Sequence, residues 1–248
     1  MDAKISRLSP HISVDCVVFG YNKQHLKVLL VERDLSLTGK TGSLQHDLKL
    51  PGSLVYNDEL LQDAANRVLR DLTGLENIFL KEFDVLDSLD RISNKRDKEW
   101  LEQTTGLAID RVISVAFYGL VHLENGVAGT KSKQASWVAI DKTDSLPFDH
   151  SEIILRAYTL LRNRIINEDI AFGLLPKKFS IAELQQVMQV FMNRSLDSRN
   201  FRKKLKSMDY IVPLNEKQLS VAHKPAQLYK FDKRRYQQYR KRKNPVLL

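Results

Sequence analysis

The chain divides into two parts by charge. From residue 174 onward it carries 18 Lys and Arg against 5 Asp and Glu, a net charge of +13. Residues 1–173 carry 21 basic and 25 acidic residues, a net charge of −4. For a chain of 248 residues, a mildly acidic body and a strongly basic C-terminal third predict two domains, the second with a polyanionic partner. The alternative is that the basic surface contacts only solvent.

The remaining composition favours a soluble cytoplasmic protein. The apolar fraction of 43% is enough for a sizeable core. No apolar run reaches the ~18 to 20 residues of a membrane span, and the N-terminus lacks the apolar core of a secretory signal. A single cysteine, Cys16, excludes an intramolecular disulfide and lies in an apolar run. We therefore expect it to be a buried, inert thiol in a reducing compartment.

The first 165 residues alternate short apolar runs with polar connections, as expected of a mixed domain of helices and strands. Runs rich in Val, Leu and Ile predict strands at 11–20, 26–34, 78–89, 111–121 and 135–140. Apolar residues at three- and four-residue spacing predict helices at 58–72 and 148–165. Helix-cap residues are expected at Asn57 or Asp58, at Gly74 and at Asp149. The polar stretch 90–110 is predicted to be an insert with a short helix around 98–103.

The pattern changes after a connection at 166–176. Ser180 and Glu183 have the spacing of a capping box at the start of a helix predicted at 179–194. A basic helix within 195–211, capped by Asp197, and a hairpin within 211–231 complete the order of a winged helix-turn-helix. We therefore expect domains at 1–165 and 177–248, joined by a linker at 166–176. The second domain includes a basic tail, 233–243.

Residues 52–75 resemble the Nudix box, G-x5-E-x7-R-E-U-x-E-E-x-G-U, in which U is a large apolar residue. With one extra residue in the first spacer, the matching residues are Gly52, Glu59, Arg67, Leu69, Gly74 and Leu75. The strand order on either side of the box is also that of the family, so the resemblance covers most of 12–165. It implies a Nudix-like α/β/α sandwich with a mixed sheet, and hence an α+β chain once the winged helix is added.

The family's metal-binding glutamates are missing. Their positions hold Val68, Asp71 and Leu72, of which only Asp71 has an oxygen ligand for magnesium. Glu59 remains, but its family counterpart is mainly structural, with Arg67 as its partner. The sequence therefore predicts no catalytic residues, no metal, no cofactor and no enzymatic activity. The alternative is a shifted alignment in which carboxylates arrive from elsewhere, such as the insert at 90–110.

Several segments resemble a narrower group, the Nudix-related bacterial transcription factors. They are LPKKFSIAELQQV, RNFRKKL, KPAQLYKF and SLPFDHSEII. Members of this group include repressors of NAD synthesis that sense ADP-ribose-type ligands, and arabinose-responsive regulators. The resemblance implies a ligand-responsive DNA-binding transcriptional regulator, with a degenerate Nudix domain that senses a sugar or an ADP-ribose-type metabolite; whether it acts as a repressor, like the repressors of NAD synthesis, or as an activator stays open. It also implies a homodimer on a roughly palindromic operator. The long insert departs from the group's pattern.

Candidate DNA contacts lie in the second helix and near the predicted wing tip. They are Ser198, Arg199, Asn200, Arg202, Lys203, Lys206, Lys217, His223 and Lys224. Most of those in the helix lie away from its apolar stripe, where Arg can bind guanine edges and the others can reach phosphates or bases. Asn200 has a second possible role, capping the turn. The tail is expected to add phosphate contacts. Its Tyr236 and Tyr239 either pack on the domain or stack on bases.

Candidate effector contacts in the first domain are charged or polar residues at strand ends and in the loop before the box: Arg33, His46, Lys49, Asp90 and Arg111. Such groups can hydrogen-bond sugar hydroxyls or phosphates, although each is also an ordinary surface residue type. Two other functions remain open at this point. One is a Nudix hydrolase of nucleoside diphosphate derivatives with a nucleic-acid-binding tail. The other is a structural RNA-binding module.

Overall fold

The computed structural model describes residues 8–33, 47–123, 134–218 and 225–243. The chain divides into two compact units, Met1–Tyr158 and Thr159–Leu248, and each is described by itself. The division falls inside a helix, whereas the sequence places it after residue 165. Within the described ranges, none of the helices combines the length and the apolar composition that a membrane crossing requires.

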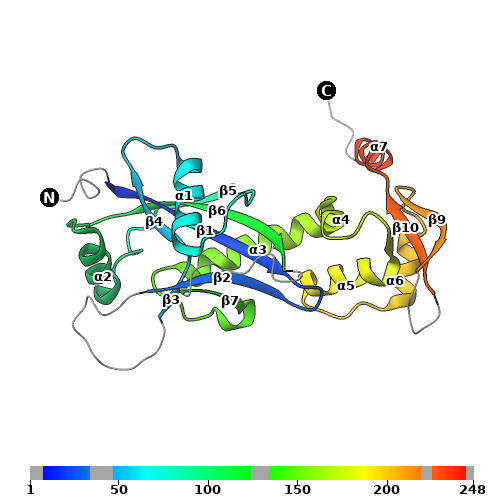
Figure 1. Cartoon of the computed structure of the whole chain (residues 1–248), viewed down its shortest axis with the longest axis horizontal. Helices are drawn as coiled ribbons and strands as arrows, with labels where there is room; N and C mark the ends of the chain where they lie inside the picture. Colours follow the sequence, from blue (N-terminus) through cyan, green and yellow to red (C-terminus); the bar gives the residue numbers. More distant parts are fainter. Residues whose placement is uncertain (1–7, 34–46, 124–133, 219–224, 244–248) are drawn as a thin grey trace. The chain divides into compact units, whose positions relative to one another are not determined.

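The first unit is built on a seven-stranded mixed sheet (Figure 1). Its strands are β1 (Leu8–Tyr21), β2 (Leu26–Glu32), β3 (Leu48–Lys49), β4 (Gly52–Tyr56), β5 (Lys81–Leu86), β6 (Ile113–His122) and β7 (Ala135–Ala139). The order is β3-β2-β1-β6-β5, with β4 paired to β1 and β7 paired to β2. The central pair, β1 and β6, is parallel, and the other pairs are antiparallel. The strands predicted from the apolar runs are confirmed. The sequence did not predict β3 and β4, which are short.

Two helices cover opposite faces of this sheet. Cys16 on β1 lies 3.7 Å from the Ala65 carbonyl of α1 (Leu61–Thr73), while its neighbour Asp15 contacts His150 at the start of α3 (His150–Asn167). Because successive strand residues point to opposite faces, α1 and α3 lie on opposite sides. The face under α1 is apolar and forms the main core. The face under the start of α3 carries buried charges.

Helix α1 ends as the sequence predicts but begins differently. Gly74 has a φ of 71°, and its N–H donates to the Arg70 carbonyl, which confirms it as the C-cap. The N-cap position is Leu60, and no side chain caps the helix, so the expected cap at Asn57 or Asp58 is wrong. The helix starts later because the Tyr56 N–H donates to the Glu59 carboxylate, which shapes residues 57–60 into a separate turn.

The insert forms a longer helix than its sequence indicates. Helix α2 (Lys95–Thr105) is capped by Asn94, whose side chain accepts hydrogen bonds from the N–H groups of Arg96 and Asp97. A short 3₁₀ helix, η3 (Ile140–Lys142), follows β7. Asp149, expected to cap α3, directly precedes that helix: its carbonyl accepts the Ile153 N–H at 3.1 Å, and its carboxylate binds the Arg91 guanidinium with both oxygens.

The second unit has the order of a winged helix. Its elements after α3 are α4 (Ile170–Gly173), β8 (Phe179–Ser180), α5 (Ile181–Met192), α6 (Ser198–Leu205), β9 (Ile211–Lys217), β10 (Gln227–Phe231) and α7 (Lys233–Lys243). The strands form a sheet in the order β8-β10-β9. The predicted capping box of Ser180 and Glu183 is present, and Asp197 caps α6 by accepting the Asn200 N–H at 2.8 Å. Helix α4 lies within the predicted linker, 166–176.

An aromatic cluster holds α7 on this unit. Phe172 stacks on Phe231 with ring centroids 4.1 Å apart, and Tyr210 meets the edges of Tyr236 and Tyr239. The Tyr236 hydroxyl also donates to the Asn167 carbonyl at 3.3 Å. Of the two roles considered for these tyrosines, packing on the domain is therefore the one observed. A buried Tyr236 has no face left for a base.

Candidate nucleic-acid interface and effector site

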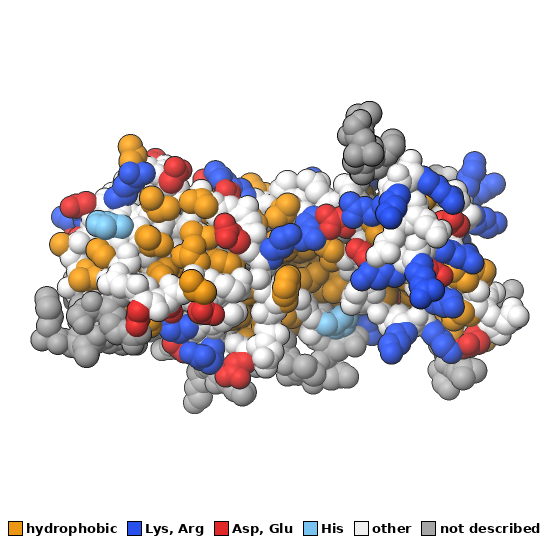
Figure 2. Space-filling view, turned by 90° about the horizontal axis from the view of Figure 1, so that it is seen from above, with side chains coloured by type: hydrophobic (Ala, Val, Ile, Leu, Met, Phe, Trp, Pro, Cys, Tyr) orange, Lys and Arg blue, Asp and Glu red, His pale blue; other side chains and the backbone are white. Residues whose placement is uncertain are grey.

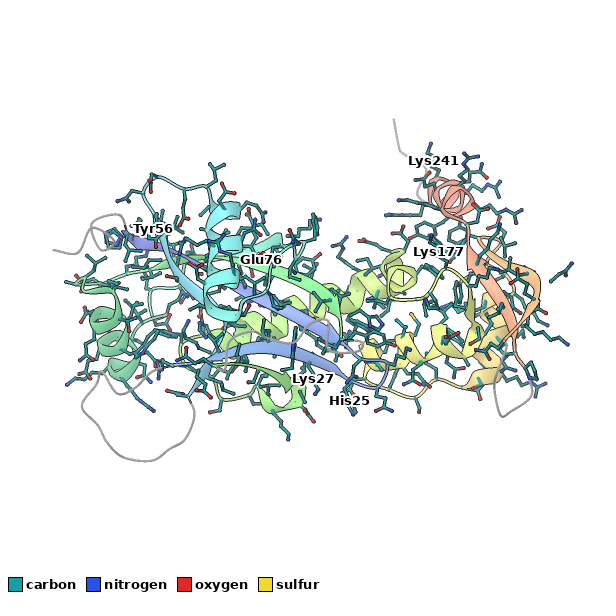
Figure 3. The ribbon with its side chains drawn as sticks, in the orientation of Figure 1. His25, Lys27, Tyr56, Glu76, Lys177 and Lys241 are labelled. Carbon is teal, nitrogen blue, oxygen red and sulfur yellow. The ribbon has the colours of Figure 1, made fainter. Side chains whose placement is uncertain are left out.

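The Nudix-like box is held together by an ion pair between its loop and its helix. The Glu59 carboxylate accepts hydrogen bonds from Arg67 Nε at 2.9 Å and from the Tyr56 N–H at 2.7 Å. The Arg67 guanidinium lies 4.0 Å from the centre of the Tyr56 ring and donates to the Leu54 carbonyl. Burial alone would raise the pKa of Glu59, but Arg67 and the Tyr56 N–H lower it below its usual value. The ion pair between Glu59 and Arg67 that the Nudix resemblance implies is therefore confirmed. Tyr56, which contacts both residues, is labelled in Figure 3.

The positions that would hold magnesium in a Nudix hydrolase do not fit that ion. The Val68 side chain is packed in the core and only 1% exposed, and Leu72 packs against the same core. Asp71 is about half exposed and pairs with Arg70 at 3.2 Å. Among the residues that the structure describes, no group of three or more His, Cys, Asp or Glu is placed to hold a metal ion. This helix face therefore supplies hydrophobic contacts, not oxygen ligands.

The face of the sheet under the start of α3 carries a buried network centred on Asp15. Its carboxylate accepts hydrogen bonds from the Ser114 hydroxyl at 2.5 Å and from Arg91 Nη2 at 3.3 Å, and it lies 3.5 Å from His150 Nε2. The Leu50 N–H donates to His150 Nδ1, which leaves Nε2 to carry the ring proton toward Asp15. Burial raises the pKa of Asp15, but its partners outweigh burial and hold it well below the usual range.

This network also explains Gly52. A Cβ atom at that position would lie 2.1 Å from an Asp15 carboxylate oxygen, so no side chain fits there without moving a buried charge. The first glycine of the box is thus required by close approach to Asp15.

A second buried ion cluster joins the insert to the sheet. Arg33, at the end of β2, has a side chain that is 1% exposed and binds both Asp47 and Asp97. The other Asp97 oxygen accepts the Phe148 N–H at 2.9 Å. The Arg33 guanidinium also lies 5.4 Å from the centre of the Trp100 ring. Helix α2 is therefore attached to the sheet by charge and by aromatic packing.

The structure separates the predicted effector residues. Arg33 and Asp90 line a polar groove of about 400 Å³ beside α2. Lys49 lines a smaller cavity of about 50 Å³, where its Nζ donates to the carbonyls of Leu50 and Gly52. Burial lowers the pKa of Lys49 to about 8.

Two further predicted effector residues lie elsewhere. Arg111 is absent from the linings of both cavities and donates from Nη2 to the Asp87 carbonyl at 3.3 Å. His46 lies outside the described residues. Sequence reasoning missed Arg91, which lines both cavities. Nothing in the polar stretch around it distinguishes Arg91 from other surface arginines, because its partners Asp15 and Asp149 are distant in sequence.

Helix α6 presents a polar and basic face. Of the predicted DNA contacts, Ser198, Arg199, Asn200, Arg202, Lys203, Lys206 and Lys217 are exposed. Leu205 is buried and Phe201 partly buried, as the apolar stripe predicts. Ser198 accepts a hydrogen bond from Gln185, and the Asn200 N–H is used by the cap. The structure does not describe His223 and Lys224.

A second basic surface is α7. Seven of its eleven residues are Lys or Arg, and Lys241 is an exposed example (Figure 3). Figure 2 shows Lys and Arg side chains gathered over the winged helix unit on the face that it presents. The charge division seen in the sequence is thus a property of this unit's surface.

Comparison with known proteins agrees with this architecture. Residues 171–231 match the NrtR DNA-binding winged helix domain. The ADPR responsive transcriptional repressor NtrR of Acinetobacter baylyi is 23% identical over 229 residues, which cover 90% of this chain and 82% of that protein.

Two crystal structures have the same fold over most of their length. Shewanella oneidensis NrtR complexed with a 27mer DNA has a TM-score of 0.61 at 21% identity, covering 89% of this chain and 93% of that one. A MutT/nudix family protein from Enterococcus faecalis has a TM-score of 0.60 at 22% identity, covering 90% and 86%. The predicted fold, a Nudix-like sandwich followed by a winged helix, is confirmed. Residues 171–231 therefore form a NrtR DNA-binding winged helix domain, which follows a domain with a Nudix-like fold.

Proposed function

We propose that this protein is an effector-responsive repressor. Its winged helix binds duplex DNA, and its Nudix-like domain binds a metabolite of the ADP-ribose type or a sugar such as arabinose. One observation carries the proposal: a winged helix with an exposed basic α6 follows a Nudix-like domain whose metal positions are occupied by Val68 and Leu72. The Acinetobacter relative, named as an ADPR-responsive repressor, supports the choice of effector class.

For DNA binding, α6 is proposed to enter the major groove. Arg199 and Arg202 are the best candidates for base recognition, because a guanidinium binds the O6 and N7 atoms of guanine with two hydrogen bonds. The remaining exposed groups are proposed to contact phosphates and to fix the orientation of the helix. Two copies of the chain would place two such helices on a roughly palindromic operator.

The residues at the metal-binding positions of the Nudix-like box argue against hydrolysis. A Nudix hydrolase activates water and neutralises the diphosphate with magnesium held by several carboxylates. Here only Asp71 remains at those positions, exposed and paired with Arg70. The proposed role of the domain is to bind its ligand without cleaving it. Binding then changes DNA affinity only if the ligand prefers one of two states of the protein.

The central test is the effect of ADP-ribose on DNA binding. Duplexes that the full-length protein selects from a random pool serve as the probe, and fluorescence anisotropy gives the Kd. We expect saturating ADP-ribose to raise the Kd by about 5- to 150-fold, the usual range of allosteric coupling. L-Arabinose is the parallel arm, and chromatography of each sample with magnesium checks for cleavage. An unchanged Kd with both ligands would contradict the effector role, and turnover at enzymatic rates would contradict the binding-only role.

Helix α7 is proposed to add phosphate contacts to those of α6. The triple substitution Arg240→Gln, Lys241→Gln and Arg242→Gln should lower the slope of log K against log salt concentration by about 2 to 3, because each lost phosphate contact changes that slope by about 0.9. Tyr236 and Tyr239 remain, so the helix should stay docked. The matched control replaces three exposed lysines of the first unit, Lys81, Lys95 and Lys142, by Gln in the same way. Equal slopes for wild type and the α7 variant would show that α7 does not touch DNA.

A further inference from the structure

The polar groove beside α2 is lined in part by Arg91, a buried cation with an unused hydrogen-bond donor. The Arg91 side chain is 6% exposed. Its Nε and Nη2 donate to the Asp149 carboxylate at 2.7 and 2.8 Å, and Nη2 also reaches Asp15. Its Nη1 is the one buried side-chain nitrogen or oxygen in the described part of the chain that has no hydrogen-bond partner. Leaving such a donor unpaired is unfavourable, so an acceptor is expected at this position.

The surroundings of Arg91 have the form of a small-molecule site. The groove has a volume of about 400 Å³, within the range of ligand pockets. Its walls come from the segment before α2 and the first turn of that helix on one side, and from the loop before α3 and its first turn on the other. Polar groups such as Asp90, Ser93 and Asn94 line it, while Phe148 supplies an aromatic surface.

The charge of the groove selects among ligand chemistries. Three arginines line it against five carboxylates. The arginines are already paired: Arg33 with Asp47 and Asp97, Arg91 with Asp149, and Arg96 with Asp47 at 3.3 Å. A diphosphate would therefore enter a site with excess negative charge, where like charges repel. A neutral polyhydroxyl group meets no such penalty, because carboxylates accept from hydroxyls and Arg91 can donate to a sugar oxygen.

We propose that this groove binds the sugar part of the effector. In this arrangement Arg91 Nη1 donates to a ring or hydroxyl oxygen, and the Asp90 carboxylate accepts from a sugar hydroxyl. The inference rests on the proposed function, because it takes the Nudix-like domain to be the effector-binding domain. Two sources share this chemistry: a free pentose, and the terminal ribose of ADP-ribose. For the second source, the diphosphate and adenosine would lie outside the groove.

The test combines groove variants with ligands that contain or lack the sugar. Calorimetry on the full-length chain uses ADP-ribose, ADP, D-ribose and L-arabinose. Asp90→Asn should weaken binding of the sugar-containing ligand about tenfold, the loss expected for one hydrogen bond to a charged group. It should leave ADP binding unchanged, because ADP lacks the terminal ribose. Asp63→Asn, an exposed carboxylate on α1, is the matched control and should bind all ligands as the wild type does.

A second variant addresses Arg91 directly. Arg91→Lys keeps a positive charge for Asp149 and Asp15 but removes the Nη1 donor, so we expect a further loss of about tenfold for the same ligand. Arg70→Lys on the exposed side of α1 is its control. Should Arg91→Lys fail to fold, as judged by its thermal unfolding curve, Asp90→Asn alone decides the outcome.

The outcomes separate this inference from the function it rests on. Loss of affinity for ADP-ribose, with ADP unaffected, supports a site for the terminal ribose. Loss of affinity for a free pentose in the same variants supports a site for a free sugar. If ADP-ribose or a pentose binds both variants as tightly as the wild type and still releases DNA, the groove assignment is overturned and the repressor function stands. Equal losses for ADP and ADP-ribose would place the diphosphate in the groove and overturn the neutral-sugar assignment. No binding by any of the four ligands would overturn both.

Discussion

The substitution Val68→Glu should destabilise the protein by about 3 to 5 kcal/mol and should restore no hydrolysis. The position is that of a metal-binding glutamate in the Nudix box, but here its side chain packs with Ala64, Ala65 and Leu69 against the sheet. A glutamate in this core is either ionised without a partner or protonated with a raised pKa. Both states cost free energy of folding at neutral pH.

The pH dependence of the stability of Val68→Glu identifies the cause of its destabilisation. A carboxyl group whose pKa is raised in the folded state binds more protons when the protein is folded. The stability of the folded variant therefore falls as the pH rises above about 4.3, the pKa of a glutamate in the unfolded chain. The stability difference from wild type, measured by urea unfolding, should therefore be larger at pH 7.5 than at pH 4.5. A cavity or a steric clash alone would give the same difference at both pH values.

Asp71→Glu is the control for the same helix. This residue is exposed, and the added methylene lies in solvent, so its stability should change by no more than about 0.5 kcal/mol. Magnesium-dependent cleavage by Val68→Glu, with the stability of the wild type, would show that this face of α1 is open to ligands. The interpretation of the Nudix-like domain as a binding domain would then be wrong.

The sequence predicted the features that depend on neighbours along the chain. Ser180 and Glu183 are three residues apart, so the capping box is visible directly. Gly74 follows an apolar stripe of helical spacing and ends the helix as expected. The Glu59–Arg67 pair was also expected, because the Nudix resemblance fixes both positions. Local spacing and a known motif are sufficient for all three.

Contacts between distant segments were not predictable in the same way. Arg91 is 76 residues from Asp15 and 58 from Asp149, and Arg33 is 64 residues from Asp97. A charged residue at a strand end has the same sequence signature whether it binds a ligand or a buried partner. Arg33 and Lys49 were therefore predicted as effector contacts, although the structure shows their charged groups bonded to the protein itself.

Helix α7 illustrates a second limit of sequence reasoning. Its seven basic residues repel one another, which disfavours an isolated helix, and the sequence left open whether its tyrosines pack on the domain or stack on bases. The helix forms on the domain because Tyr236 and Tyr239 pack against Tyr210. Tertiary packing thus decides the conformation of a segment whose own composition opposes it.

Replacing both Arg199 and Arg202 by alanine should nearly abolish sequence-specific DNA binding. Each guanidinium that binds a guanine edge contributes about 1 to 3 kcal/mol of discrimination, so each single substitution should weaken operator binding by about 10- to 100-fold. Both side chains are exposed on α6, whereas Phe201 is partly buried and Leu205 buried, so stability should remain within about 0.5 kcal/mol of wild type. Anisotropy at fixed salt with the selected operator and a scrambled duplex measures the effect.

The comparison of the two duplexes distinguishes base recognition from general attraction. The α6 substitutions should reduce the ratio of operator to scrambled-duplex affinity, because phosphate contacts carry no sequence information. The α7 substitutions should lower both affinities together and leave that ratio unchanged. A control that removes two exposed arginines elsewhere, Arg70→Ala with Arg162→Ala, should leave the ratio unchanged as well. If the ratio stays at its wild-type value in the α6 variant, another element reads the bases, and α6 contributes only positive charge.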